Sequence, residues 1–155
     1  MEFVEVACFC KYCGEMFTRQ RECRDEIEAE RMRLWARDYS GMCPKCYKAN
    51  EEQKAMARAA KLNLPIIIGR TTKQIKFAFT LRDQYITSHK DAIQYAINKL
   101  QDINPEEVEK VSAEMGVDKD SCVELAFRKM GRYAEYICLT ESDASLIIEA
   151  LKSQA

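Results

Sequence analysis

Two C-x-x-C pairs constrain this chain more than any other feature of its sequence. The first pair is Cys10 and Cys13, the second is Cys43 and Cys46, and 29 residues separate them. A structural zinc ion takes four tetrahedral ligands, and each C-x-x-C turn can direct two thiolates toward one centre. Four thiolates leave no open position for a catalytic water. The spacing therefore predicts one structural zinc ion, and the long gap predicts an insertion between the two pairs.

The other cysteines leave one alternative open. Cys8 and Cys10 would lie on the same face of a strand, so Cys8 could replace Cys10 as a ligand. We expect Cys23, Cys122 and Cys138 to pack as small apolar residues. The first residues show no signal-peptide pattern, and no apolar run approaches the length of a membrane span. Reduced thiols in a cytoplasmic protein are therefore expected.

The first 64 residues predict a small α+β zinc module. Residues 3–10 are β-branched and aromatic and lead into the first cysteine pair, and residues 16–18 could return as a second strand. Residues 22–38 are dense in helix formers and predict an inserted helix, with Ile27, Leu34 and Trp35 near one face. A second helix is expected from Asn50 through Ala60. The module would resemble a zinc ribbon or a treble clef, and the helix after the second pair favours the treble clef.

Residues 65–155 predict a helical domain, so the chain as a whole would be mainly α. The segment 75–81 alternates apolar and polar residues as a strand does, but its apolar stripe continues at helical spacing to Leu100, which favours a helix. Asn104 and Pro105 begin a further helix, for which a buried face of Val108, Val111 and Met115 is expected.

The last part of the chain predicts three more segments. A helix is expected over 118–130, with Cys122, Leu125, Ala126 and Met130 as its apolar residues. Residues 132–139 are apolar enough for a buried helix or strand. Thr140 or Ser142 would cap a final helix that carries Leu146, Ile147, Ala150 and Leu151.

Charge is distributed unevenly along the chain, whose formal net charge is −1. Residues 70–100 contain six basic and two acidic residues, whereas residues 101–124 contain eight acidic and two basic residues. These blocks could be solvated faces that pair with each other, or a basic strip for phosphates beside an acidic face for protein contacts. The candidate binding residues, near the first cysteine pair and in the basic block, are Lys11, Tyr12, Arg19, Arg21, Arg24, Lys73 and Lys76.

Catalytic patterns are missing from the sequence. His89 is the single histidine, and there is no glycine-rich phosphate loop, H-E-x-x-H motif or nucleophile elbow. We therefore expect a non-enzymatic protein.

The order of motifs over residues 8–85 resembles a known group of proteins. The motifs are C-K-Y-C-G, a charged insertion with one tryptophan, C-P-K-C-Y before a helix, and T-K-Q-I before a long helix with Leu81 and Arg82. They are similar to those of small, largely uncharacterised zinc-knuckle proteins of Firmicutes phages and mobile elements. There the last motif is commonly L-T-G-x-x-K-Q-I-x-W-A-x-x-I-R, and this chain has Phe77 or Ala78 near the usual tryptophan. The resemblance implies a phage-linked protein in the cytoplasm of a bacterial host.

Two functions remain in view. The first is a zinc protein that binds nucleic acid or a nucleoprotein complex, on the strength of the closed metal site and the arginines near it. The alternative is a protein inhibitor of a host defence nuclease, an anti-defence factor of the anti-CRISPR kind. It rests on the small size, the phage-like resemblance and the acidic block.

Overall fold

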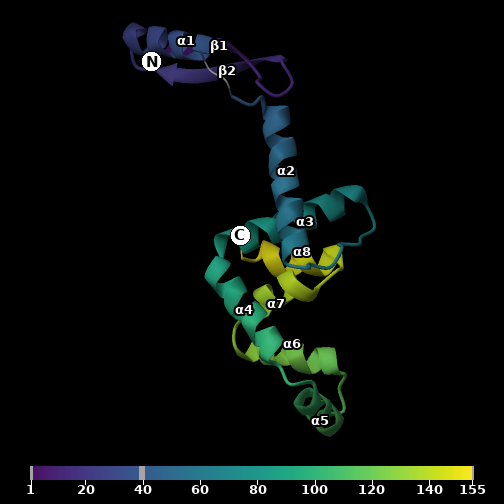
Figure 1. Ribbon diagram of the computed structural model, residues 1–155. Coiled ribbons are helices and arrows are strands. Elements are labelled where there is room, and N and C mark those ends of the chain that lie inside the picture. The colour runs from purple at the N-terminus through teal and green to yellow at the C-terminus, as the bar shows by residue number, and fades with distance from the viewer. Residues whose placement is uncertain (1, 39–40, 155) are drawn as a thin grey trace. The chain divides into compact units, whose positions relative to one another are not determined.

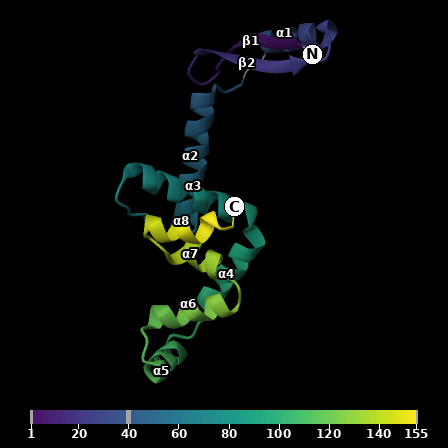
Figure 2. The ribbon, with the colours of Figure 1, turned by 180° about the vertical axis from the view of Figure 1, so that it is seen from behind.

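The computed structural model describes residues 2–38 and 41–154, which form a mainly helical chain with one small antiparallel sheet (Figures 1 and 2). In chain order the described elements are β1 (Glu2–Phe9), β2 (Met16–Cys23), α1 (Glu26–Asp38), α2 (Pro44–Lys61), α3 (Thr72–Ser88), α4 (Lys90–Asp102), α5 (Pro105–Met115), α6 (Lys119–Lys129), α7 (Tyr133–Thr140) and α8 (Ala144–Lys152).

The chain divides into two compact units. The N-terminal unit is Met1–Met56 and the C-terminal unit is Ala57–Ala155. The division falls within α2, so this helix begins in one unit and ends in the other. The boundary between domains that the sequence predicts comes after residue 64, close to the end of the same helix. Each unit is described separately below.

The N-terminal unit consists of a β-hairpin with α1 packed on one face (Figure 1). Because side chains alternate between the faces of a strand, Val4, Val6 and Cys8 of β1 all point to the same side and are buried. Across the ladder, Val6 pairs with Arg19 and Cys8 pairs with Phe17 of β2. The residues of α1 that complete this small core are Ala29, Met32 and Ala36. Their modest size allows the helix to approach the sheet closely.

Helix α1 differs from its prediction in its start and in its buried face. The helix begins at Glu26 rather than at residue 22, because Cys23 ends β2 and is fully buried against the core. Ile27, Leu34 and Trp35 are 67%, 51% and 43% exposed. The sheet thus packs against the alanine side of the helix, and the larger apolar residues remain at the surface.

Helix α2 begins earlier than expected. Its first residue is Pro44 rather than Asn50, so Cys46 lies within the first helical turn. Proline is well tolerated there, because its missing N–H would have no partner inside the helix. Of the expected apolar stripe, Ala55 is buried but Met56 is 65% exposed.

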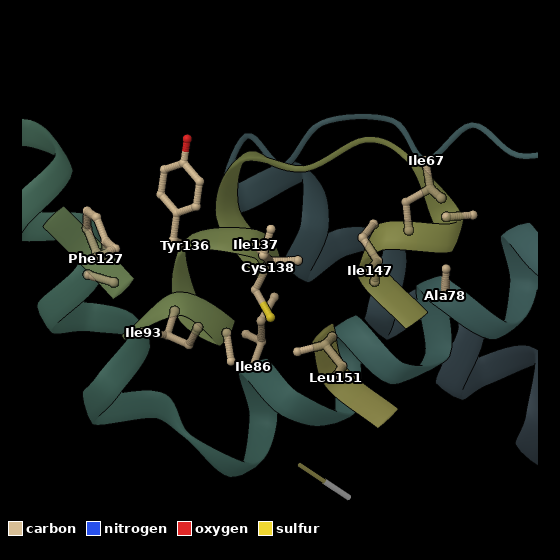
Figure 3. Packing of buried hydrophobic residues seen from close by; sticks show 13 residues of the cluster. Ile67, Ala78, Ile86, Ile93, Phe127, Tyr136, Ile137, Cys138, Ile147 and Leu151 are labelled. Atoms are coloured by element: carbon tan, nitrogen blue, oxygen red, sulfur yellow. The ribbon is translucent and has the colours of Figure 1, made fainter. Parts of the chain in front are cut away.

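The C-terminal unit has the larger core, drawn in Figure 3. Helix α3 packs along α8, and α7 contacts α3, α4, α6 and α8. The buried residues are Ile67, Ala78, Ile86, Ile93, Ala96, Phe127, Ala134, Tyr136, Ile137, Cys138, Ala144, Ile147 and Leu151. Residues 75–81 are helical, as favoured, and the chain turns at His89 between α3 and α4. Residues 133–140 form a helix whose positions 134–138 are all buried, which resolves the second helix-or-strand alternative.

The segment before α3 is tied to the start of α8. Ile68 forms a parallel bridge with Asp143, through N–H···O bonds of 2.8 Å to Ser142 and from Ala144. A side chain at Gly69 would place its Cβ 2.9 Å from that of Ala144, so only glycine suits this crossing. Residues 67–69 are thereby held against the last helix.

The start of α3 has the S/T-x-x-Q sequence of a capping box, with one difference in its hydrogen bonds. Thr71 caps the helix by accepting a hydrogen bond from the Gln74 N–H. The Gln74 side chain accepts from the backbone of Arg70, rather than from Thr71 as in a complete capping box, and donates to Ser145 of α8. One glutamine therefore connects the helix start to a second element.

Two other predictions for this unit were wrong in detail. Asp143, rather than Thr140 or Ser142, caps α8, because its carboxylate accepts from the N–H groups of Ser145 and Leu146. Helix α5 starts and ends where expected, but it has no buried residue: Val111 is 38% and Met115 is 54% exposed. Its packing is against α6 alone among the described elements, so it has too little cover to bury a face. The helix expected over 118–130 is confirmed as α6, with Asp118 as its N-cap. Its buried residue is Phe127, whereas Leu125 and Met130 are partly exposed.

Candidate metal centre and arginine groove

The two C-x-x-C pairs come together at one point in the N-terminal unit. The sulfur atoms of Cys10, Cys13, Cys43 and Cys46 all lie within 4.8 Å of one another. The Sγ atoms of Cys13 and Cys43 are 3.8 Å apart. Four thiolates at about 2.3 Å from a tetrahedral zinc ion would be roughly 3.8 Å apart, so this arrangement suits such an ion. The four thiols are within the distance at which they could hold one metal ion.

Backbone hydrogen bonds shape both cysteine turns. The first turn closes through a 2.8 Å bond from the Gly14 N–H to the Cys10 carbonyl, and Gly14 has the positive φ of 72° that the sequence predicts there. In the second, the Cys46 N–H donates to the Cys43 sulfur at 3.4 Å. The Lys11 N–H also donates to the Gly41 carbonyl at 3.1 Å, which joins the two turns directly.

The thiols of Cys10 and Cys46 do not ionise alike. Hydrogen bonding from the Cys43 backbone lowers the pKa of Cys10 to about 6. The neighbouring thiols of Cys43 and Cys13 raise the pKa of Cys46 to about 12. Like charges this close together oppose one another, so one thiolate forms readily and the next does not. A divalent cation removes this repulsion, because a coordinated thiol is held as thiolate.

The remaining cysteines lie outside the cluster. Cys8 is fully buried with Val4 and Val6 in the core between the sheet and α1, while Cys10 belongs to the four-thiol cluster. The geometry therefore favours Cys10 over the alternative Cys8. Cys23 and Cys138 are also fully buried, as expected for packed residues, whereas Cys122 is half-buried.

A groove of about 670 Å³ lies between β2 and α1. It is lined by Arg19, Gln20, Arg21, Glu28, Arg31, Met32 and Trp35, and we call it the arginine groove. Arg19 and Arg21 are two positions apart on a strand and share its α1-facing side. On α1, Arg31 and Trp35 are four positions apart and share one helical face. The two-residue spacing of the strand and the four-residue spacing of the helix thus place these side chains in the same groove.

The groove has a positive balance, with three basic residues and one acidic residue. The Arg19 guanidinium lies 5.8 Å from the ring of Phe17 and 5.9 Å from the ring of Trp35, within the range of cation–π attraction. Arg21 contacts Glu28 at 3.5 Å, a long ion pair whose arginine side chain is 62% exposed. The other Glu28 oxygen accepts from the Arg24 N–H at 3.0 Å. Glu28, the one carboxylate that lines the groove, therefore already pairs with the Arg21 side chain and the Arg24 backbone.

The structure brings together only some of the predicted binding residues. Arg19 and Arg21 line the groove, whereas Arg24 follows β2 and is exposed outside the lining. Lys11 and Tyr12 are exposed on the first cysteine turn, with the Lys11 amine 5.3 Å from the Tyr12 ring. Lys73 and Lys76 are exposed on α3 of the C-terminal unit.

Sequence reasoning missed Arg31, Met32 and Trp35 as groove residues. The i, i+4 spacing of Arg31 and Trp35 is a visible signal, but it identifies a site only once the facing strand is known. The basic block 70–100 also needs a correction, because Arg82 is only 3% exposed. It donates to the Pro65 carbonyl at 2.8 Å, and burial lowers its pKa. Arg82 therefore supports the core and adds nothing to a basic surface.

Comparison with known proteins adds no relative: no protein-family model, curated protein or solved structure matches the chain. Within the described residues, no helix combines the length and the apolar character needed to cross a membrane.

Proposed function

We propose that the chain is a non-enzymatic zinc protein whose N-terminal unit binds nucleic acid through the arginine groove. The observation that carries this proposal is the gathering of Arg19, Arg21, Arg31 and Trp35 in one open groove. Guanidinium groups form paired hydrogen bonds to phosphate oxygens, and indole rings stack on bases. The two kinds of group in one place suit a ligand that carries both phosphates and bases.

The metal has a structural role in this proposal. One zinc ion would be bound by Cys10, Cys13, Cys43 and Cys46, and would join the hairpin turn to the first turn of α2. This is the arrangement of a treble-clef-like module, in which a hairpin and a helix start each contribute two ligands. Zinc in small modules contributes about 10–16 kcal/mol of binding free energy to folding, so it would hold β2 and α1 in the geometry of the groove.

Binding of labelled random DNA and RNA at about 50 mM salt tests the proposed function, because phosphate contacts are strongest at low salt. The double variant Arg21→Gln with Arg31→Gln should weaken binding and make the salt slope shallower by about one for each phosphate that is no longer neutralised. Its matched control is Arg33→Gln, which removes a charge from α1 outside the groove lining. Arg33 pairs instead with Glu26 at 2.8 Å and with Glu30 at 3.1 Å.

The outcome that would end the proposal is no binding of either nucleic acid at that salt concentration by protein with its zinc content verified. The groove variant removes two charges and Arg33→Gln removes one. A loss of binding free energy in the groove variant no more than twice that in Arg33→Gln would also count against the proposal, since binding would then follow net charge alone.

The alternative, inhibition of a host defence nuclease, has one observation in its favour. The sheet face away from α1 presents Phe3, Phe9 and Met16, which are 76%, 65% and 67% exposed. Exposed apolar side chains of this size are common in protein contacts. If a purified defence nuclease is inhibited by the chain, Phe9→Ser should relieve the inhibition and the groove variant should not. An inhibition that both variants leave unchanged would remove this support.

A further inference from the structure

The shape of the arginine groove says more about its ligand than its charge does. The groove is a concave space between a strand and a helix, and its volume of about 670 Å³ lies within the range of small-ligand pockets, roughly 300–1,000 Å³. A duplex is a rigid convex rod whose bases are stacked on one another, and only its outer edges reach a protein. A single strand can place an unstacked base inside such a groove.

The side chains of the groove form a platform for one base. Trp35 is 43% exposed, and the Arg19 guanidinium lies 5.9 Å from its ring and 5.8 Å from that of Phe17. These contacts hold a planar cation and an indole in place before any ligand arrives. Arg21 and Arg31 are exposed beside them, where the phosphates on either side of a stacked base would lie. This combination of a basic groove with an aromatic platform is how proteins bind single strands without reading their sequence.

We propose that the arginine groove binds single-stranded nucleic acid, with one base stacked on Trp35 and the flanking phosphates held by Arg21 and Arg31. The inference rests on the proposed function and specifies its ligand. Because stacking depends little on which base is present, the preference is for strandedness rather than for sequence.

Trp35 is the single tryptophan of the chain, so its fluorescence reports on the groove alone. The full chain with zinc bound is titrated with labelled thymidine and uridine oligonucleotides of about 12 nucleotides and with a duplex of equal length. Anisotropy gives the affinity and indole emission gives the stacking. Quenching that saturates with the same dissociation constant as the anisotropy, and affinity for the single strand at least tenfold above that for the duplex, are expected.

Trp35→Ala should weaken single-strand binding by about 5- to 150-fold, the usual range for loss of one base–aromatic stack. Leu34→Ala is the matched control, because Leu34 is a neighbouring exposed residue of α1 outside the groove lining. Neither side chain belongs to the core between α1 and the sheet, and zinc content with circular dichroism verifies that both variants fold.

The possible outcomes separate this inference from the proposed function. Equal binding of duplex and single strand without quenching overturns the single-strand inference and leaves nucleic-acid binding intact. No binding of any nucleic acid at about 50 mM salt overturns both. Poly-glutamate, a third titrant, tests whether the groove binds any acidic chain. If it quenches Trp35 fluorescence and competes as strongly as the oligonucleotides, the groove recognises acidic chains in general and the single-strand inference is wrong.

Discussion

The two units of this protein are held together by different means. The core of the N-terminal unit consists of one face of a two-stranded sheet and one side of α1, and its buried residues are mostly small. Among its described residues, the core of the C-terminal unit contains thirteen buried apolar residues, including Phe127 and four isoleucines besides Ile67. A small core rarely contributes enough free energy to keep a unit of this size folded, and many small domains are further stabilised by a structural metal ion. The four-thiol cluster thus lies in the unit with the smaller core, where a bound metal ion would add most to stability.

The contrast extends to the charged side chains. In the C-terminal unit, Arg82 bonds to the Pro65 carbonyl, and Arg132 pairs with the buried Glu135 at 3.2 Å. Arg58 contacts Asp83 through two bonds of 2.8 and 2.6 Å, which attaches the end of α2 to α3. In the N-terminal unit, three arginines instead line an open groove. Basic side chains thus stabilise the fold of one unit and shape an open surface in the other.

The largest effect is expected from removing the metal. Cys13→Ser with Cys46→Ser should abolish binding of one zinc ion per chain and unfold β1, β2 and α1, because about 10–16 kcal/mol of binding free energy is lost. The C-terminal unit should keep its helices. Elemental analysis and hydrogen exchange resolved along the chain measure the two results. Cys122→Ser, a half-buried cysteine outside the cluster, is the control. Unfolding of both units together would contradict the expectation that the C-terminal unit keeps its helices.

The converse experiment removes the core of the C-terminal unit. Phe127→Ala should lower the free energy of unfolding of that unit by about 3–5 kcal/mol, since Phe127 is fully buried and contacts Tyr136 at a ring distance of 5.3 Å. Zinc content should not change. Urea unfolding followed by circular dichroism measures the loss, and Met115→Ala, at a 54% exposed position, should stay within about 0.5 kcal/mol of the wild type. Loss of zinc from Phe127→Ala would show that the two units fold as one.

Alkaline pH should weaken the C-terminal unit by an intermediate amount. Burial raises the pKa of Cys138 from 9 to about 12 and that of Tyr85 from 10 to about 12. Both groups are neutral when protonated, and the unfolded chain loses these protons at lower pH than the folded one. The stability is therefore fully present below about pH 9 and is lost as the pH rises toward 12. The loss is up to about 1.4 kcal/mol per pH unit for the buried Cys138, and less for Tyr85, which solvent partly screens.

Urea midpoints between pH 8 and pH 11 measure this slope. Cys138→Ala should make the slope shallower, although the variant starts from lower stability because it also leaves a small cavity. Ile93→Val, a change in the same core that removes no titratable group, should leave the slope as it is. An unchanged slope in Cys138→Ala would mean that the thiol does not contribute to the pH dependence.

The smallest effect is expected at the contact between α2 and α3. The side chains of Arg58 and Asp83 are 38% and 20% exposed, so solvent screens much of their attraction. A double-mutant cycle with Arg58→Gln and Asp83→Asn should give a coupling of about 0.2–1 kcal/mol in thermal or urea unfolding. The more exposed pair of Lys54 and Glu51 serves as the comparison and should give less. A coupling of zero would mean that the end of α2 is held by apolar contacts.

Much of the local structure could be predicted because the signals lie within a few residues of one another. Asn104 caps the helix it was expected to begin, and Thr71 caps α3 from directly before it. Gly14 and Gly116 adopt the positive φ that their turns require, and the chain turns at His89. The four cysteines could be assigned to one centre for a similar reason. Each pair defines its own turn, and four thiols have few other ways to be satisfied.

The tertiary structure decided which surfaces are buried and which are open. In α1, the alanine side faces the sheet because small residues permit close approach, and Trp35 therefore remains exposed on the groove. Arg19 and Arg31 line the same groove only because β2 runs beside α1. The spacing of residues within either element does not predict this. Capping and turn chemistry act over one helical turn, so the sequence by itself determines them. The choice of a helical face depends on the partner that packs against it, and only the folded chain supplies that partner.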